Sequence, residues 1–402
     1  MNILHIANND SGGAANAMLC LHNSLLANQI QSKILVLHKC SDYENIIPFL
    51  RNRNLFEKID HSIKYRAFNL NRMYDRNTYK INSDFTYYNG PYDITKHRLY
   101  EWADIIHLHW YHNFVNLDKL LKNSSKPCLY TLHDENLFLG GFHYSFDKEI
   151  ANIKSWKIEK KLYLNKLKLF KSHNHIQYVA PSRWLFDLLH EKNYNPCSYI
   201  AYGVKSNLNK LLNKQEQKIK LGIPPTKLTF LLTSTNLNTP RKGVQETIRS
   251  FVNNCNGKNT LLIVGKGNNN YNNENIKYLG YVSNQERLCE IYSASDFFIN
   301  PALADNLPNT VLESLACGTP VIGFDCGGMR DMINNSNGFL YPVGDFECLF
   351  KTNYQNFIYE MDRNEIRKNA IKQFSIDTQY DKYMNLYNAT FLRSKNRVKK
   401  VK

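Results

Sequence analysis

The sequence predicts an α/β protein made of two doubly wound domains, each built on a parallel sheet. Three observations indicate this fold. The chain has 402 residues, a length that suits two domains of about 200 residues each. Short buried-strand signals alternate with helical signals in both halves, as in βαβ units. A segment rich in Lys, Asn and Gln, 205–227, ends in Gly222-Ile223-Pro224-Pro225 and separates the two sets.

The first half starts with a predicted strand over 3–7. A helix is expected over 14–28, because apolar residues recur there every three or four positions. Residues 41–100 are aromatic and rich in Asn, and they give no clear pattern. Further strands are expected at 33–38, 105–108, 127–132 and 176–180.

The second half shows the same alternation. Strands are expected at 228–234, 260–264, 276–279, 297–300 and 320–324, and helices at 243–253, 284–294 and 310–316. We place the first domain at 1–204, the second at 205–375, and a helix at 376–402 that packs back on the first domain and carries a basic tail. Ligands of such sheets bind at the carboxyl ends of the strands. We therefore expect a site in a cleft that the two domains face.

Composition narrows the function classes. The chain is 43% hydrophobic and 21% charged, which excludes a wholly disordered or collagen-like chain. It has no run of about 18 apolar residues, so no transmembrane helix is predicted, and its start does not resemble a signal peptide. The nine cysteines form no CxxC pair, which favours reduced thiols in the cytoplasm.

The net charge of +16 favours anionic partners. Nucleic acid, an anionic membrane and phosphorylated substrates all fit the charge. No nucleic-acid-binding module is recognisable and the basic residues are spread along the chain, so we do not expect nucleic acid as a partner. Residues 154–171 hold seven lysines and one acid, Glu159, with apolar residues at helical spacing. This pattern indicates either a surface helix with a solvated lysine face or a helix lying on anionic lipid.

A glycine pair follows the first predicted strand. Gly12 and Gly13 open the helix after Asp10-Ser11, and the free N–H groups of a helix N-terminus suit a phosphate. The alternative is a tight turn without a ligand. The spacing differs from GxGxxG, so a dinucleotide fingerprint is not predicted.

Histidines follow two strands of the first half. His107 and His109 face one side of their strand, but no third ligand at typical spacing is evident, so no metal site is predicted. His133, in Leu132-His133-Asp134, lies at a strand end, where it serves either a site or a hydrogen-bonded loop. The nearby Gly140-Gly141 suggests a mobile loop at the mouth of the cleft.

Charged residues follow two strands of the second half. Arg241 and Lys242 precede a predicted helix, where cations suit a diphosphate, although a solvated turn has the same pattern. Asp305 lies in a loop, and Glu313 lies eight positions later on a helix that starts near Asn309. Carboxylates accept hydrogen bonds from sugar hydroxyls, and the amides near Asn309 and Thr310 suit a phosphate.

The stretch 300–323 resembles the glycosyl transferases group 1 family, retaining GT-B enzymes that use nucleotide-sugars. The chain is most similar to the bacterial branch that builds capsule, O-antigen and colanic-acid-type polysaccharides. The similarity continues through Asp325-Cys326-Gly327-Gly328 and 337–342. It is clear at 1–40 and 127–145 and weak at 41–100.

The resemblance implies a GT-B fold of two Rossmann-like domains, with the acceptor on the first and the donor on the second. The family's E-x7-E motif falls on Asp305, whose loop would hold the donor sugar, and Glu313, which would hold the ribose. It implies a diphosphate site at Gly12, Gly13 and Lys242, with Asn236 at the position of the family's arginine and Arg241 as its substitute. His133 would lie beside the transferred sugar. The remaining donor-binding residues implied are Asn306, Leu307, Pro308, Asn309 and Thr310.

The implied activity is transfer of a sugar from a nucleotide-diphosphate-sugar to a saccharide or polyprenyl-linked acceptor, with retention of configuration and no metal cofactor. His133 and Asp305 are the expected catalytic residues. The expected place is the inner face of the cytoplasmic membrane, where the helix at 154–171 would bind anionic lipid. The alternative is a catalytically silent sugar-nucleotide-binding or scaffold protein of the same fold.

Overall fold

The computed structural model divides the chain into two compact units. Unit 1 comprises Met1–Ala201 and Gln379–Lys402, and unit 2 comprises Tyr202–Thr378. Residues 205–210 of the expected linker, and the side chains of the basic tail beyond 395, lie outside the described part. The structure describes residues 1–51, 54–124, 126–173, 176–204, 211–254, 257–267, 273–358 and 360–401.

Unit 1 contains a seven-stranded parallel sheet in the order β3-β2-β1-β4-β5-β6-β7. The order reverses between β1 and β4, which therefore flank the switch point of the sheet. The strands are β1 (Asn2–Asn9), β2 (Gln31–His38), β3 (Ile46–Pro48), β4 (Ile105–Leu108), β5 (Cys128–Thr131), β6 (Ile176–Ala180) and β7 (Cys197–Tyr199).

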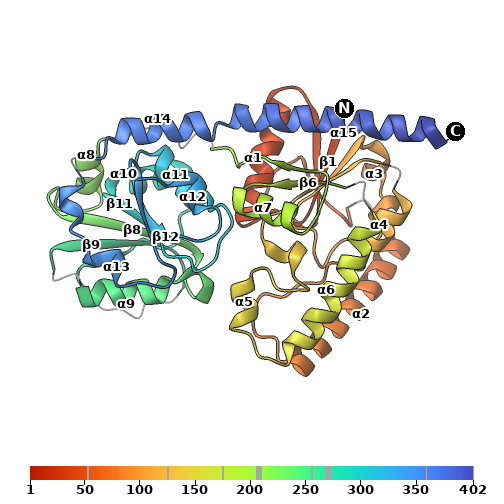
Figure 1. The fold of residues 1–402 in the computed structure, drawn as a ribbon, viewed down its shortest axis with the longest axis horizontal. Helices are drawn as coiled ribbons and strands as arrows, with labels where there is room; N and C mark the ends of the chain where they lie inside the picture. The colour runs from red at the N-terminus through yellow and green to blue at the C-terminus, as the bar shows by residue number, and fades with distance from the viewer. Residues whose placement is uncertain are drawn as a thin grey trace. The chain divides into compact units, whose positions relative to one another are not determined.

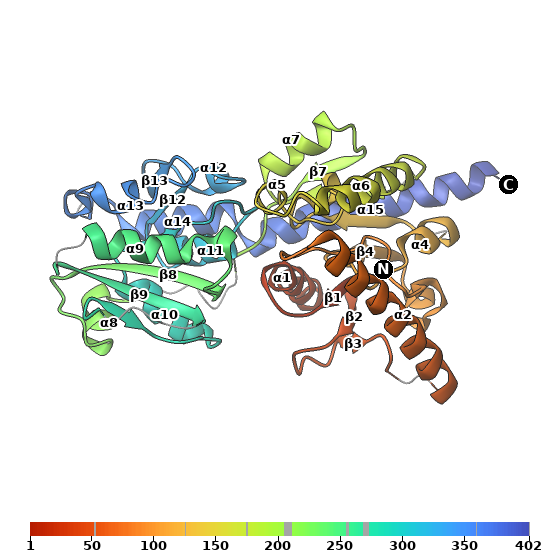
Figure 2. The same ribbon diagram turned by 90° about the horizontal axis from the view of Figure 1, so that it is seen from below.

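Helices cover both faces of this sheet (Figures 1 and 2). On one face, Ile3 and Ile105 pack with Leu21 of α1 and with Tyr383 and Tyr387 of α15. On the other face, strand residues pack with side chains of α3, α4, α6 and α7. The helices are α1 (Gly13–Ala27), α2 (Leu55–Tyr79), α3 (Arg98–Trp102), α4 (Leu117–Asn123), α5 (Ser145–Glu149), α6 (Ser155–Lys171), α7 (Arg183–Glu191) and α15 (Ile376–Val401).

Unit 2 contains a six-stranded parallel sheet in the order β10-β9-β8-β11-β12-β13, whose switch point lies between β8 and β11. Its strands are β8 (Leu228–Asn236), β9 (Asn259–Lys266), β10 (Ile276–Tyr278), β11 (Phe297–Asn300), β12 (Val321–Phe324) and β13 (Gly338–Tyr341). In Figure 1, α10 and α11 lie above this sheet and α9 and α13 below it. The helices are α8 (Lys214–Lys220), α9 (Val244–Asn254), α10 (Gln285–Ala294), α11 (Asn309–Ala316), α12 (Met329–Met332), α13 (Cys348–Lys351) and α14 (Arg363–Gln373).

The predicted class, two doubly wound parallel-sheet units, is confirmed. The main omission falls in 41–100, where the structure has the 25-residue helix α2. The side chain of Asn54 caps this helix and Glu57 caps the amide of Asn54 in return, a capping box visible in the sequence. None of the described helices has the length and apolarity needed to cross a bilayer.

Candidate active site

In unit 2 the candidate residues lie on loops that follow β8 and β11, the two strands at the switch point. The turn Pro240–Lys242 follows β8, and the loop carrying Asp305 follows β11. Two hydrogen bonds join these segments. The amide of Leu303 donates to the carbonyl of Arg241 at 2.8 Å, and the Arg241 guanidinium donates to the carbonyl of Ala304 at 2.5 Å. The structure therefore brings both predicted groups together.

Two glycines make this close approach possible. Gly243 has φ of 60°, and a Cβ at this position would lie 2.2 Å from the carbonyl oxygen of Pro301. Gly327, in the loop after β12, has φ of 54°, and a Cβ there would lie 1.8 Å from the carbonyl oxygen of Asp305. Left-handed backbone favours glycine, and both contacts exclude a side chain. The Asp305 loop is therefore held between its two neighbours.

Asp305 forms an ion pair with Lys242. Their Oδ2 and Nζ atoms lie 2.6 Å apart, and the amide of Asn306 donates to Oδ1 of Asp305 at 3.0 Å. Burial raises the pKa of Asp305, but Lys242 and Arg241 outweigh burial, and the pKa lies below its usual value. Asp305 is therefore an anion at neutral pH. From the sequence we expected Lys242 at the diphosphate and Asp305 at the donor sugar. No sequence pattern indicated that the two side chains form an ion pair.

Glu313 lies on α11, the helix that directly follows the Asp305 loop. It is partly exposed, and its Oε2 accepts a hydrogen bond of 3.2 Å from the hydroxyl of Tyr292. Pro308 precedes the helix, and no side chain of the described residues caps its first turn. Asn306, Leu307 and Pro308 are buried, whereas the first two helical residues, Asn309 and Thr310, are partly exposed.

In unit 1 the glycine loop follows β1. Gly12 has φ of 91°, caps α1 and is exposed together with Gly13. The buried carboxylate of Asp10 fixes the start of this loop. It accepts hydrogen bonds from the amides of Cys40 and Ser41 at 2.6 and 3.0 Å, and from the Ser41 hydroxyl at 2.6 Å. Sequence reasoning noted Asp10 only as part of the loop, because its partners lie about 30 positions away.

His133 follows β5 and is partly buried. Its Nε2 lies 3.0 Å from Nδ1 of His109, a residue that follows β4. Burial lowers the pKa of His133 to about 4, so the ring is neutral at pH 7. The neighbouring Asp134 is anionic. Burial raises its pKa, but the close His143, whose Nδ1 lies 2.6 Å from Oδ2, more than offsets this effect.

The segment 140–144 is packed in the interior, so the predicted mobile loop is wrong. A Cβ on Gly140 would lie 2.0 Å from the carbonyl oxygen of Glu159, and one on Gly141 would lie 2.3 Å from the Phe85 ring. The Glu159 carboxylate accepts hydrogen bonds from the amides of Gly140, Gly141 and Phe142 at 2.6, 2.7 and 3.3 Å. These glycines permit close packing and do not provide mobility.

The prediction of a lysine face on 154–171 holds only in part. Lys157, Lys160, Lys161, Lys168 and Lys171 of α6 are exposed. Lys166 is 1% exposed and donates to the side-chain and backbone oxygens of Asn136. Burial lowers the pKa of Lys166 to about 7. Lys166 therefore supports the segment around Asn136 and does not belong to a solvated lysine face.

Three histidines of unit 1 offer the spacing of a metal site. Nitrogen atoms of His5, His107 and His109 lie within 4.8 Å of one another, and His5, from β1, is the third residue that sequence spacing did not reveal. However, His107 lies with Nδ1 2.7 Å from the Tyr387 hydroxyl and Nε2 2.8 Å from the Thr131 hydroxyl. Both of its nitrogens are thus engaged, and the geometry favours a hydrogen-bonded cluster.

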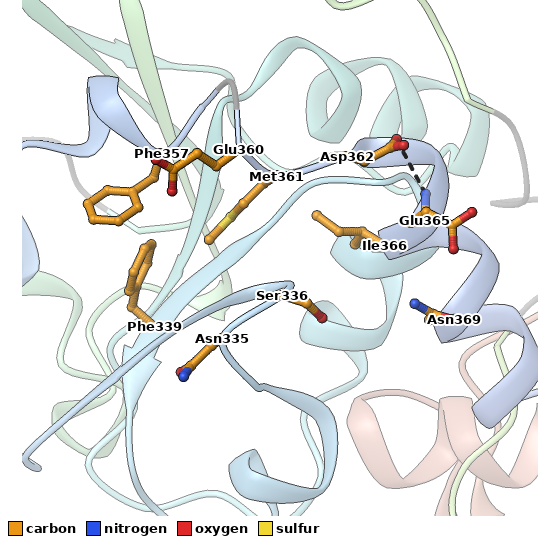
Figure 3. Close-up of a pocket in the computed structure, with 10 residues that line it drawn as sticks. All are labelled: Asn335, Ser336, Phe339, Phe357, Glu360, Met361, Asp362, Glu365, Ile366 and Asn369. Atoms are coloured by element: carbon orange, nitrogen blue, oxygen red, sulfur yellow. Dashed lines mark hydrogen bonds between the residues drawn. The ribbon is translucent and has the colours of Figure 1, made fainter.

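A pocket of about 610 Å³ lies elsewhere in unit 2 (Figure 3). It is lined by apolar side chains such as Phe339 and Met361 and by acids such as Glu360. Asn335 and Ser336, also in its wall, precede β13 and so lie at the amino end of that strand. The candidate residues follow the carboxyl ends of β8 and β11, so this pocket is not the candidate site.

Comparison with known proteins agrees with this arrangement. Residues 229–353, which include the Arg241–Lys242 turn and the Asp305 loop, match the family of glycosyl transferases group 1. Among curated relatives, a GDP-mannose-dependent alpha-mannosyltransferase from Mycobacterium tuberculosis is 35% identical over 79 residues. That match covers 19% of this chain and 21% of the relative, so the chain matches only about a fifth of the length of that protein.

Solved structures match over nearly the whole chain. Sucrose-phosphate synthase from Thermosynechococcus elongatus superposes with a TM-score of 0.66 at 14% identity, covering 98% of this chain and 100% of that one. The fold is GT-B. Anabaena Alr3699/HepE, solved in complex with UDP-glucose, gives a TM-score of 0.65 at 15% identity, covering 97% of this chain and 100% of that one. At such identities these likenesses to GT-B proteins establish the fold and leave the substrates open.

Proposed function

We propose that this GT-B protein is a glycosyltransferase that moves a sugar from a nucleotide-diphosphate-sugar to a saccharide acceptor. One observation carries the proposal. The switch point of unit 2 places an anionic carboxylate, Asp305, against two cations, Lys242 and Arg241, beside the start of α11. Carboxylates recognise sugar hydroxyls and cations recognise a diphosphate, so the chemistry of both halves of such a donor is present in one place.

The residues take the following roles in this proposal. Arg241, Lys242 and the first turn of α11, at Asn309 and Thr310, bind the diphosphate. The loop from Asp305 to Pro308 binds the donor sugar, and Glu313 accepts hydrogen bonds from the ribose. Gly12 and Gly13 of unit 1 add backbone amides for the diphosphate, and His133 contacts the transferred sugar.

The reaction we propose proceeds with retention and without a covalent enzyme intermediate. The bond from the anomeric carbon to the diphosphate oxygen breaks while the acceptor oxygen attacks from the same face. Negative charge grows on the diphosphate, where Arg241 and Lys242 stabilise it. The acceptor hydroxyl passes its proton to an oxygen of the leaving diphosphate. In this mechanism Asp305 binds the donor sugar, and no carboxylate acts as a nucleophile.

The acceptor in this proposal is a polyprenyl-diphosphate-linked saccharide of bacterial surface polysaccharide synthesis, reached from the cytoplasmic side of the membrane. Two surface helices support the membrane part. Helix α2 exposes a row of large apolar side chains. Helix α6 packs against α2 (Figure 1) and exposes five lysines. Apolar residues beside cations suit an anionic lipid surface. The row on α2 comprises Leu55, Phe56, Ile59, Ile63, Leu70, Met73 and Tyr74, each between 48% and 84% exposed.

Donor binding is tested by a thermal-shift panel of UDP-, GDP-, dTDP- and CMP-sugars. We expect one nucleotide class to raise the unfolding temperature of the wild type but not of Glu313→Ala. Glu246→Ala, a partly exposed acid on α9, is the matched control and should retain the shift. Release of nucleoside diphosphate in the presence of a saccharide acceptor then distinguishes an enzyme from a protein that binds the donor without turnover. Binding without turnover on any acceptor identifies the catalytically silent binding protein, and no shift with any donor refutes the proposal.

Membrane binding is tested by sedimentation with phosphatidylglycerol and phosphatidylcholine vesicles. We expect binding to the anionic vesicles only, and loss of binding at high salt because charge screening weakens the lysine contacts. Phe56→Asp should reduce the bound fraction. Leu392→Asp makes the same change at a side chain that is 60% exposed on α15 and should leave binding unchanged. Absent or salt-independent binding contradicts this part of the proposal.

A further inference from the structure

A series of hydrogen-bonded histidines runs through unit 1 from its interior to His133. His5 on β1 lies with Nδ1 3.0 Å from Nε2 of His109, and Nδ1 of His109 lies 3.0 Å from Nε2 of His133. His5 and His109 are fully buried, whereas His133 is partly exposed. The series therefore links the protein core to the one histidine that we assign to the transferred sugar.

The hydrogen bonds along this series have to run in one direction. A neutral imidazole carries a single N–H, so each ring that donates at one nitrogen accepts at the other. Burial, together with the neighbouring histidines, lowers the pKa of His5 and of His109 well below the usual value. All three rings are therefore neutral at physiological pH. Two directions of donation remain. Either His5 donates to His109 and His109 donates to His133, or both hydrogen bonds run the opposite way.

The buried end of the series distinguishes the two directions. Nε2 of His5 is buried and has no hydrogen-bond partner among the described residues. If the series started at His133, His5 would carry its proton on this nitrogen, and a donor would be buried without an acceptor. If the series starts at His5, only a lone pair is left without a partner. In proteins, buried N–H groups without acceptors are rarer than buried lone pairs without donors. His5 is therefore the first donor of the histidine series.

We infer that His5 and His109 are positioning residues that hold the proton of His133 on Nδ1. Nε2 of His133 accepts from His109, and the proton of His133 is carried on Nδ1. This inference rests on the proposed function, in which His133 contacts the transferred sugar. In that setting His133 donates a hydrogen bond to a sugar oxygen and takes no proton at Nδ1. The acceptor's proton then goes to the leaving diphosphate.

The proton positions are measured directly by long-range ¹H–¹⁵N correlation NMR on deuterated protein labelled with ¹⁵N-histidine. The His133 signals are assigned by their loss in His133→Gln. We expect a pyrrole-type shift for Nδ1 of His133 and a pyridine-type shift for its Nε2. A pyrrole-type shift at Nε2 overturns the inference.

Two amide variants of His109 form a matched pair. In His109→Asn the amide N–H takes the place of Nδ1–H and still reaches His133. In His109→Gln the amide takes the place of Nε2, faces His5 and leaves His133 without its donor. We expect His133 to keep its proton on Nδ1 in the Asn variant, and to shift towards Nε2–H, the form that free imidazoles favour in water, in the Gln variant. Equal spectra for the two variants overturn the inference.

Turnover gives a second readout. With the nucleotide-sugar that shifts the unfolding temperature, we expect kcat to fall about tenfold in His109→Gln and to stay near wild type in His109→Asn, as for the loss of one hydrogen bond. The NMR result needs no donor, so failure of the inference is distinguishable from failure of the proposed function. Stoichiometric zinc or iron bound to the purified protein would also overturn the inference, because a metal ion at His5 and His109 would replace the hydrogen bond between them.

Discussion

Replacing Glu159 with glutamine should destabilise unit 1 by about 3 kcal/mol. The carboxylate is 3% exposed and accepts three amide hydrogen bonds, one at Oε1 and two at Oε2. In the variant, the side-chain NH₂ faces the amide of Gly140 or the pair of amides at Gly141 and Phe142. A buried donor left without an acceptor costs about 1–3 kcal/mol. The remaining bonds lose the strength that the charge gives them, about 1 kcal/mol.

Tryptophan fluorescence in urea measures this change in unit 1 alone. All four tryptophans, Trp102, Trp110, Trp156 and Trp184, lie in unit 1. A loss of 3 kcal/mol corresponds to a fall of about 6–12 °C in the unfolding temperature for a unit of this size.

The matched control is Glu191→Gln at the end of α7, where the side chain is 63% exposed. It should change stability by less than about 0.5 kcal/mol. If Glu159→Gln costs less than about 1 kcal/mol, or no more than the control, then the carboxylate does not hold the segment 140–144.

Three further outcomes are expected. The urea midpoint of unit 1 should rise between pH 7 and pH 9, by about 2 kcal/mol in stability. Lys166 has a pKa of about 7 when folded and near 10.4 when unfolded, so the unfolded chain binds more protons in this range; Lys166→Met should flatten the rise. Gly327→Ala should cost unit 2 more than about 2 kcal/mol by circular dichroism in urea, because its Cβ meets a backbone oxygen. Gly344→Ala, also at positive φ but in open space, should cost about 1 kcal/mol or less. Lys242→Met should lower kcat for nucleoside diphosphate release about 100-fold if its charge stabilises the leaving group, and an unchanged kcat would remove it from that role.

Much of the fold follows from local sequence patterns. Buried parallel strands are short apolar runs, and those at 105–108, 176–180 and 297–300 stand out against polar neighbours. Helix α2 was missed although its apolar residues recur at helical spacing, and what the sequence could not show is that this apolar face lies exposed. Its capping box at Asn54 and Glu57 was a further signal.

The candidate site was predictable only where its residues are close in sequence. The spacing of Asp305 and Glu313, and the turn at Arg241, were found from the sequence. The pairing of Lys242 with Asp305 joins residues 63 positions apart, and that of His5 with His109 joins residues 104 apart. Such contacts depend on the order of strands in the sheet, which no local pattern encodes. For the same reason the burial of Glu159 and Lys166 was invisible on a helix that looks basic.

The division of the chain has a consequence for its synthesis. Residues 202–378 form unit 2, and only afterwards does the ribosome make 379–395, which supply Tyr383 and Tyr387 to the core of unit 1. Unit 2 therefore has all of its residues available while the earlier unit still lacks part of its core. Until 379–395 are made, the sheet face of unit 1 around Ile3 and Ile105 is incompletely covered. His107 also lacks its hydrogen-bond partner, the hydroxyl of Tyr387. During translation, the unit that begins first is completed last, and a chaperone that shields apolar surface has its longest opportunity there.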